Sequence, residues 1–79
     1  MRVHCSALKH GASPEDAIQA AHWALWIEPL DDEPPYREPR LGFDTGARLL
    51  ETVVLVSENG EELVIHAMPA RRKYLDLLP

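Results

Sequence analysis

The residues with the clearest chemical potential lie at the end of the last apolar segment of the chain. Leu63-Val64-Ile65 leads directly to His66, and Arg71-Arg72-Lys73-Tyr74 follows shortly after Pro69. An imidazole titrates near neutral pH and can take or give a proton. Guanidinium and ammonium groups stabilise the negative charge that develops on a phosphate during reaction. Together these groups suit the cleavage of a phosphodiester without a metal ion.

Charge is unevenly distributed along the chain. The 79 residues include 13 Asp and Glu against 8 Lys and Arg, which gives a net charge of -5. Five acids lie between residues 28 and 38, whereas residues 67 to 75 contain three bases and no acid. A net acidic protein lacks the broad cationic surface that coats nucleic acid, but a local cluster of bases can still bind phosphates.

Length and composition favour one small domain that spans residues 1–79. A chain of this size buries a modest apolar core, so a partner that covers apolar surface would stabilise it. Cys5 is the only cysteine, which excludes an internal disulfide, and Cys5 with His4 makes a poor metal site. No apolar run is long enough to cross a membrane, and the start of the chain lacks the pattern of a signal peptide. We therefore expect a cytoplasmic protein with no membrane contact, metal or cofactor.

An N-terminal helix is predicted from Ser13 to about Ile27. Ser13 can accept a hydrogen bond from the free amide three residues later, and Pro14 suits the first helical position. Pro29 cannot extend the helix. Four prolines within residues 29–39 then indicate an irregular connector.

The rest of the chain predicts three strands and a short helix. The strands are expected at residues 36–43, 49–56 and 62–67, and the helix at residues 70–78. The second strand is dense in β-branched residues, whereas Pro39 confines the first to a sheet edge or delays its start. Residues 44–47 predict a turn, and Asn59-Gly60 predicts a type I′ hairpin turn. The expected fold class is α+β, a small antiparallel sheet of three or four strands packed against an N-terminal and a short C-terminal helix.

The predicted hairpin fixes a register and therefore two faces. With Asn59 and Gly60 as the loop, Val54 pairs with Ile65 and Val53 pairs with His66. The apolar face, which should pack on the helices, would comprise Leu50, Thr52, Val54, Val56, Leu63, Ile65 and Ala67. His66 falls on the other, partly wet face. An equally tight preceding loop would set Arg40 opposite Glu51.

The predicted N-terminal helix is apolar on both sides. Ile18 and Leu25 lie on one side, and Trp23 and Ile27 lie on the other. Such a helix is covered by another chain, for example in a homodimer through the Trp23 side, or it leaves Trp23 and Trp26 partly exposed along the domain edge. The sequence leaves both arrangements open.

Three segments resemble the BrnT family of toxin–antitoxin ribonucleases. Residues 9–17 (KHGASPEDA) are similar to its "KHG-x-S-x-E-x-A" opening, and residues 40–50 are similar to its strand, glycine loop and "G-R-L-L" strand. Residues 65–74 resemble its closing "I-S-A-R" strand and basic-tyrosine segment. This chain has His66 where that motif has serine and Met68 where it has arginine, so His66 offers a different catalytic group.

The resemblance implies a RelE-like fold that cleaves RNA without a metal and inhibits translation. It also implies a cognate antitoxin protein as partner, in addition to RNA. We therefore predict an endoribonuclease toxin of a type II toxin–antitoxin pair. The alternative is a non-catalytic module that keeps the toxin fold and binds other proteins through its helix and sheet face.

Candidate site residues follow from the chemistry of RNA cleavage, which needs a base, an acid and cations at the phosphate. The predicted proton-transfer residues are His66 with His10 or Lys9, and the predicted RNA-binding residues are Arg40, Arg48, Arg71, Arg72, Lys73 and Tyr74. Arg40 is explained equally well by a cross-strand pair with Glu51. Tyr74 can stack on a base or pack against the neighbouring leucines.

Overall fold

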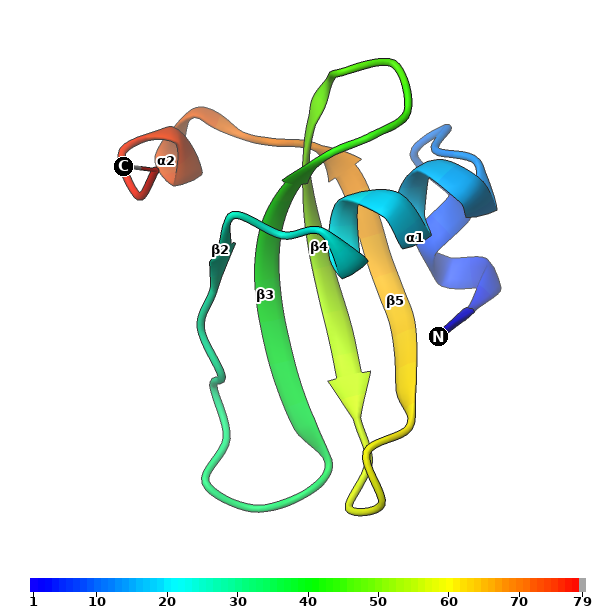
Figure 1. Cartoon of the computed structure of the whole chain (residues 1–79), viewed down its shortest axis with the longest axis vertical. Coiled ribbons are helices and arrows are strands. Elements are labelled where there is room, and N and C mark those ends of the chain that lie inside the picture. The colour runs from blue at the N-terminus through cyan, green and yellow to red at the C-terminus, as the bar shows by residue number, and fades with distance from the viewer. Residues whose placement is uncertain (79) are drawn as a thin grey trace.

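A computed structural model of the chain describes residues 1–78 and shows a twisted sheet with helices at its sides (Figure 1). The strands are β1 (Arg2–Val3), β2 (Trp26–Ile27), β3 (Tyr36–Phe43), β4 (Leu49–Val56) and β5 (Glu62–Pro69), and the helices are η1 (Cys5–Leu8, a 3₁₀ helix), α1 (Pro14–His22) and α2 (Arg72–Leu75). The sheet order is β1-β5-β4-β3-β2. β1 runs parallel to β5, and the other neighbours are antiparallel.

The α+β class is confirmed, but the predicted three or four strands are wrong because the described chain forms five. Each extra strand, β1 and β2, has only two residues and lies at a sheet edge. A two-residue strand carries no alternation of apolar and polar positions, so its pairing depends on a partner strand that is distant in sequence.

Helix α1 begins as predicted and ends earlier. Ser13 Oγ accepts a hydrogen bond from the Asp16 amide at 3.1 Å, and Pro14 occupies the first turn. The helix ends at His22 rather than near Ile27, and the following residues run along β3. The amide of Leu25 donates to the carbonyl of Leu41 at 2.7 Å. The edge of β3 thus satisfies backbone groups that a longer helix would have satisfied internally.

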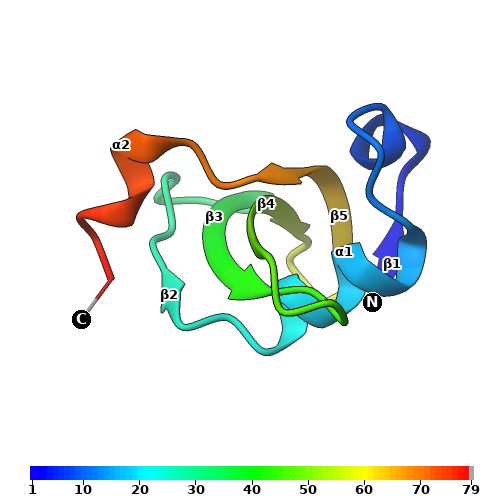
Figure 2. The same cartoon turned by 90° about the horizontal axis from the view of Figure 1, so that it is seen from above.

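Small residues allow α1 to lie close to the central strands (Figure 1). The helix buries its three alanines, Ala17, Ala20 and Ala21, against a core that includes Leu50, Val54, Val64 and Ala67. Gly42 of β3 is essential to this approach, because a Cβ at Gly42 would lie 2.1 Å from the carbonyl oxygen of Ala20. Figure 2 shows the layers from above, with α1 and α2 at separate places around the curved sheet.

The β4–β5 hairpin departs from the predicted type I′ turn. Gly60 has positive φ but Asn59 does not, and the Ser57 amide donates to the carbonyl of Glu61. The pairing of Val53 with His66 is confirmed, whereas Val54 pairs with Val64 instead of Ile65. The hairpin loop is longer than predicted, and this shifts the pairing near the loop by one residue. An irregularity between Val53 and Val54 compensates for the shift, so the pairing beyond it returns to the predicted register. Val64 therefore enters the core in place of Ile65.

The β3–β4 connection is also longer than a tight turn, so Arg40 pairs with Thr52 and not with Glu51. Asp44 organises this turn, because its carboxylate accepts hydrogen bonds from the amides of Gly46 and Arg48, each at 2.8 Å.

No helix within residues 1–78 is long and apolar enough to cross a membrane.

Candidate functional site

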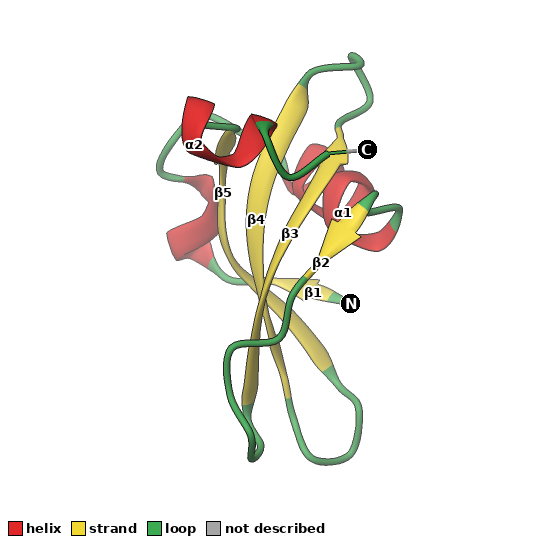
Figure 3. Cartoon of the chain, turned by 90° about the vertical axis from the view of Figure 1, so that its left-hand side faces the viewer, coloured by secondary structure: helices red, strands yellow, loops and turns green. Residues whose placement is uncertain are grey.

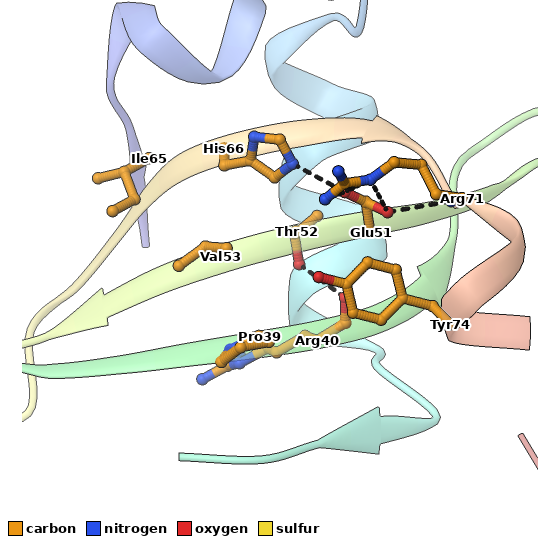
Figure 4. Close-up of a pocket in the computed structure, with 9 residues that line it drawn as sticks. All are labelled: Pro39, Arg40, Glu51, Thr52, Val53, Ile65, His66, Arg71 and Tyr74. Atoms are coloured by element: carbon orange, nitrogen blue, oxygen red, sulfur yellow. Dashed lines mark hydrogen bonds and ion pairs between the residues drawn. The ribbon is translucent and has the colours of Figure 1, made fainter. Parts of the chain in front are cut away.

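A cavity of about 320 Å³ lies on the sheet face opposite α1 (Figure 4). Its walls come from β3, β4, β5 and the C-terminal segment, and its lining residues are Pro39, Arg40, Glu51, Thr52, Val53, Ile65, His66, Arg71 and Tyr74. Strand alternation explains the location, since Glu51 and Val53 point away from the face that carries the buried Leu50 and Val54.

Glu51 is the centre of the polar side of this cavity. Its carboxylate is almost fully buried, yet it accepts hydrogen bonds from two residues (Figure 4). His66 Nε2 lies 3.1 Å from Oε1, the backbone amide of Arg71 lies 3.0 Å from Oε2, and Arg71 Nε lies 2.9 Å from Oε1. Arg71 Nη2 adds an ion pair at 2.8 Å. The buried charge is thereby compensated.

The end of β5 brings Arg71 to this carboxylate. Pro69 closes the strand, and the amide of Ala70 still donates to the carbonyl of Leu49 at 2.9 Å. Arg71 then has extended backbone angles and directs its own amide at Glu51 before α2 begins. Arg71, one of the three cations that follow His66, therefore lies with His66 in the lining of the cavity.

Competing effects set the pKa of Glu51. Burial raises it, and this is the largest single effect, but the hydrogen bonds from Arg71 and His66 together lower it below its ordinary value. The same hydrogen bond to Glu51 raises the pKa of the Arg71 guanidinium. An ionised carboxylate can only accept, so it assigns the proton of neutral His66 to Nε2. The lone pair of a neutral His66 then lies on Nδ1.

A second imidazole lies against the first. The ring centroids of His10 and His66 are 5.7 Å apart, with the planes at 74° in an edge-on arrangement. The N-terminal segment brings His10 here, because the amide of His4 donates to the carbonyl of Val64 and Ser6 Oγ donates to the carbonyl of Ile65. His10 and Lys9 are both exposed, and neither is among the residues that line the cavity.

Helix α2 places an aromatic ring and further cations beside the cavity. Tyr74 is part of the lining, with Arg71 Cζ 5.6 Å and Lys73 Nζ 5.0 Å from its ring centroid. Cations at such distances interact favourably with the ring. Arg72 is exposed on the same helix and lies outside the lining. Tyr74 thus packs with the side chains of two cations.

Two other predicted RNA-binding residues are engaged elsewhere. The Arg40 backbone lies beside the cavity, but its buried guanidinium donates to the Ala21 carbonyl at 2.9 Å and pairs with Glu38 and Glu62 at 2.8 and 2.7 Å. Arg48 pairs with Asp44 at 2.9 Å in the β3–β4 turn and does not line the cavity.

Glu51 is the functional candidate that sequence reasoning missed. An acid inside the most β-branched strand was an available signal, because an inward or half-buried carboxylate needs a cationic partner. Sequence reasoning assigned it only as a cross-strand neighbour of Arg40. Its true partners lie 15 and 20 residues further along the chain.

The residues that the structure describes form no cluster suited to bind a metal ion. Among residues 1–78, no three His, Cys, Asp or Glu side chains lie close enough to bind one metal ion.

Comparisons with protein-family models, curated proteins and solved structures gave no match.

Proposed function

We propose that the protein is a metal-independent endoribonuclease that acts in the cytoplasm as the toxin of a type II toxin–antitoxin pair. The observation that carries the proposal is the contact between His66 and His10 beside a carboxylate, Glu51, that also binds Arg71. Two imidazoles can serve as base and acid, and the guanidinium supplies charge for a phosphate. The resemblance of residues 9–17, 40–50 and 65–74 to BrnT toxins supports RNA as the substrate and an antitoxin as the partner.

In this mechanism His66 is the general base. Nδ1 of neutral His66 takes the proton of the ribose 2′-hydroxyl while the 2′-oxygen forms a bond to phosphorus. The bond between phosphorus and the 5′-oxygen breaks, and the imidazolium of His10 protonates that oxygen. The products are a 2′,3′-cyclic phosphate and a 5′-hydroxyl. Glu51 orients His66 through Nε2 and stabilises its cationic form after proton transfer.

Arg71 is the phosphate-binding residue in this scheme. Its Nε and Nη2 are paired with Glu51. Half of the side chain is exposed, so the guanidinium can also reach a non-bridging phosphate oxygen. Arg72 and Lys73 add positive charge from α2, and Tyr74 offers a ring on which a base can stack.

The test is RNA cleavage by protein purified without any partner. We expect single-stranded RNA to be cut in the presence of EDTA and the new ends to carry cyclic phosphate. His66→Ala and His10→Ala should each lower the rate by about a hundredfold or more. His22→Ala is the matched control, because His22 is exposed on α1 and contacts Trp23 instead of the cavity. Cleavage that survives His66→Ala would remove His66 from the mechanism.

The second candidate is a toxin-like protein-interaction module without catalytic activity. The apolar side chains that remain exposed beside β2, among them Trp23 at 70% and Leu25 at 54%, favour this function. A module of this kind would neither cut RNA nor arrest growth when expressed alone. It would still bind its partner protein after His66→Ala.

A further inference from the structure

The exposed apolar side chains of this protein concentrate on one side of the molecule. Six of the eight large apolar residues that are exposed within residues 1–78 lie at the end of α1, around β2, and in or just after α2; they are Trp23, Leu25, Ile27, Leu30, Leu75 and Leu77. Figure 3 shows β2 and α2 on the side of the molecule that faces the viewer. We refer to these six residues as the β2 edge surface. Clustered exposed apolar residues of this kind mark interaction sites.

The strand at the centre of this surface is an unpaired edge. β2 is last in the sheet order, and within residues 1–78 no strand pairs with its outer side. Only Trp26 and Ile27 are in strand conformation, and Pro29 lacks the amide needed to extend a ladder. Side-chain contacts, supported by a short strand pairing, must therefore carry any association through this edge.

Opposite charges occupy the two ends of the β2 edge surface. Arg72 and Lys73 lie on α2 at the upper end in Figure 1, and the connector from β2 to β3, with Asp32 and Glu33, occupies the lower end. None of these four side chains forms an ion pair within residues 1–78. Asp76 partly offsets the bases, whereas Asp31 of the connector is neutralised by Arg37.

A surface that is positive at one end, apolar in the middle and negative at the other end is complementary to itself. A two-fold axis that lies beside the outer edge of β2 and runs perpendicular to the strand sets the basic end of one copy against the acidic end of the other. The same operation aligns the two β2 strands antiparallel and brings their apolar residues together. We infer that a second copy of this chain occupies the β2 edge surface and forms a two-fold symmetric dimer. This inference is independent of the proposed catalytic function.

The test is the mass of the protein in solution over a wide concentration range, measured by analytical ultracentrifugation. We expect a reversible dimer. Leu25→Thr combined with Ile27→Thr should weaken dimerisation at least about tenfold, because two apolar side chains leave the interface while β propensity is kept. A circular dichroism spectrum and melting temperature like those of the wild type would exclude misfolding. A monomer at every concentration would overturn the inference and leave the surface to a different protein.

Variants with reversed charge test how the two chains are oriented relative to each other in the dimer. The variant Asp32→Lys, Glu33→Lys carries basic groups at both ends, and the variant Arg72→Glu, Lys73→Glu carries acidic groups at both ends. Each variant alone should dimerise more weakly than wild type, and an equimolar mixture should recover a heterodimer with two complementary contacts. Assemblies larger than two chains in the mixture, or no recovery, would contradict the two-fold arrangement.

Discussion

The buried carboxylate of Glu51 accepts the backbone amide of Arg71 and pairs with the guanidinium of the same residue. The backbone amide and the guanidinium of Arg71 thus both bind the carboxylate of Glu51. Within residues 71–78, Arg71 is the residue whose side chain is hydrogen-bonded to the sheet. The Glu51–Arg71 pair therefore holds the start of α2, and with it Tyr74, at the cavity that contains His66.

Replacing Glu51 by glutamine should impair both structure and activity. The neutral side chain loses the charge-assisted hydrogen bonds, so unfolding should become easier by about 1–2 kcal/mol, allowing for the half-exposed Arg71. RNA cleavage should fall at least about tenfold because His66 loses the negative charge that stabilises its cationic form. Urea unfolding and a cleavage assay measure these effects. Glu58→Gln on the exposed hairpin is the control and should change neither.

The lowered pKa of Glu51 predicts a loss of stability in acid. The pair with Arg71 contributes fully above the ordinary glutamate pKa of 4.5, and this contribution disappears as the pH falls through the lower pKa of the folded state. The stability difference between wild type and Glu51→Gln should be constant above about pH 5.5 and shrink below about pH 4.5. A difference that persists unchanged in strong acid would show that Glu51 is not ionised in the fold.

Arg40 should matter for stability and not for RNA binding. Its guanidinium is buried and joins α1, β3 and β5 through the Ala21 carbonyl, Glu38 and Glu62. Arg40→Ala should destabilise the protein by about 2–4 kcal/mol, since two partly buried carboxylates lose their partner. At a temperature where the variant is folded, RNA affinity measured by fluorescence anisotropy should equal that of wild type. A large loss of affinity in folded protein would restore Arg40 to the RNA-binding set.

Gly42 should tolerate no side chain. A Cβ there would lie 2.1 Å from the Ala20 carbonyl oxygen, which belongs to the backbone of α1 and cannot rotate away. Gly42→Ala should therefore cost about 3 kcal/mol or more in thermal unfolding. Gly46→Ala is a matched control, because its Cβ would meet only Asp44 Oδ1 at an ordinary 3.5 Å. Equal melting temperatures for the two variants would contradict the close packing of α1 on β3.

Asp31 should titrate far below a normal aspartate. The Arg37 side chain donates to it through Nε and Nη2, the Arg37 amide donates at 2.8 Å, and these bonds lower the pKa of Asp31 to about 2. Carbon-detected NMR of the carboxyl group measures this value directly. Arg37→Gln should raise the pKa towards 3.8, the ordinary value.

Local signals were enough to predict the major elements. The capping serine at Ser13 and the β-branched run of 49–56 act over a few residues, and they set the start of α1 and the bounds of β4. β5 extends beyond its predicted end at residue 67 and includes Pro69. The pairing of Val53 with His66 was also predictable, because the β4–β5 hairpin is local.

The candidate site was predictable in part. His66 and the bases after it were identified by residue type and order, and His10 through the resemblance of residues 9–17. The sequence did not indicate that His10 contacts His66, nor that Glu51 accepts from both His66 and Arg71. Neither contact produces a periodic pattern in the sequence from which it could be predicted.

The sequence by itself determined the α+β class, the three long strands and the location of the cations at one end. Only the tertiary structure decided the short strands β1 and β2, the core position of Val64, the burial of Arg40 and the partners of Glu51. The physical reason is the distance along the sequence over which each interaction acts. Caps, turns and strand propensities are interactions between near neighbours, whereas these outcomes depend on backbone edges and charges that become neighbours only after the sheet has formed.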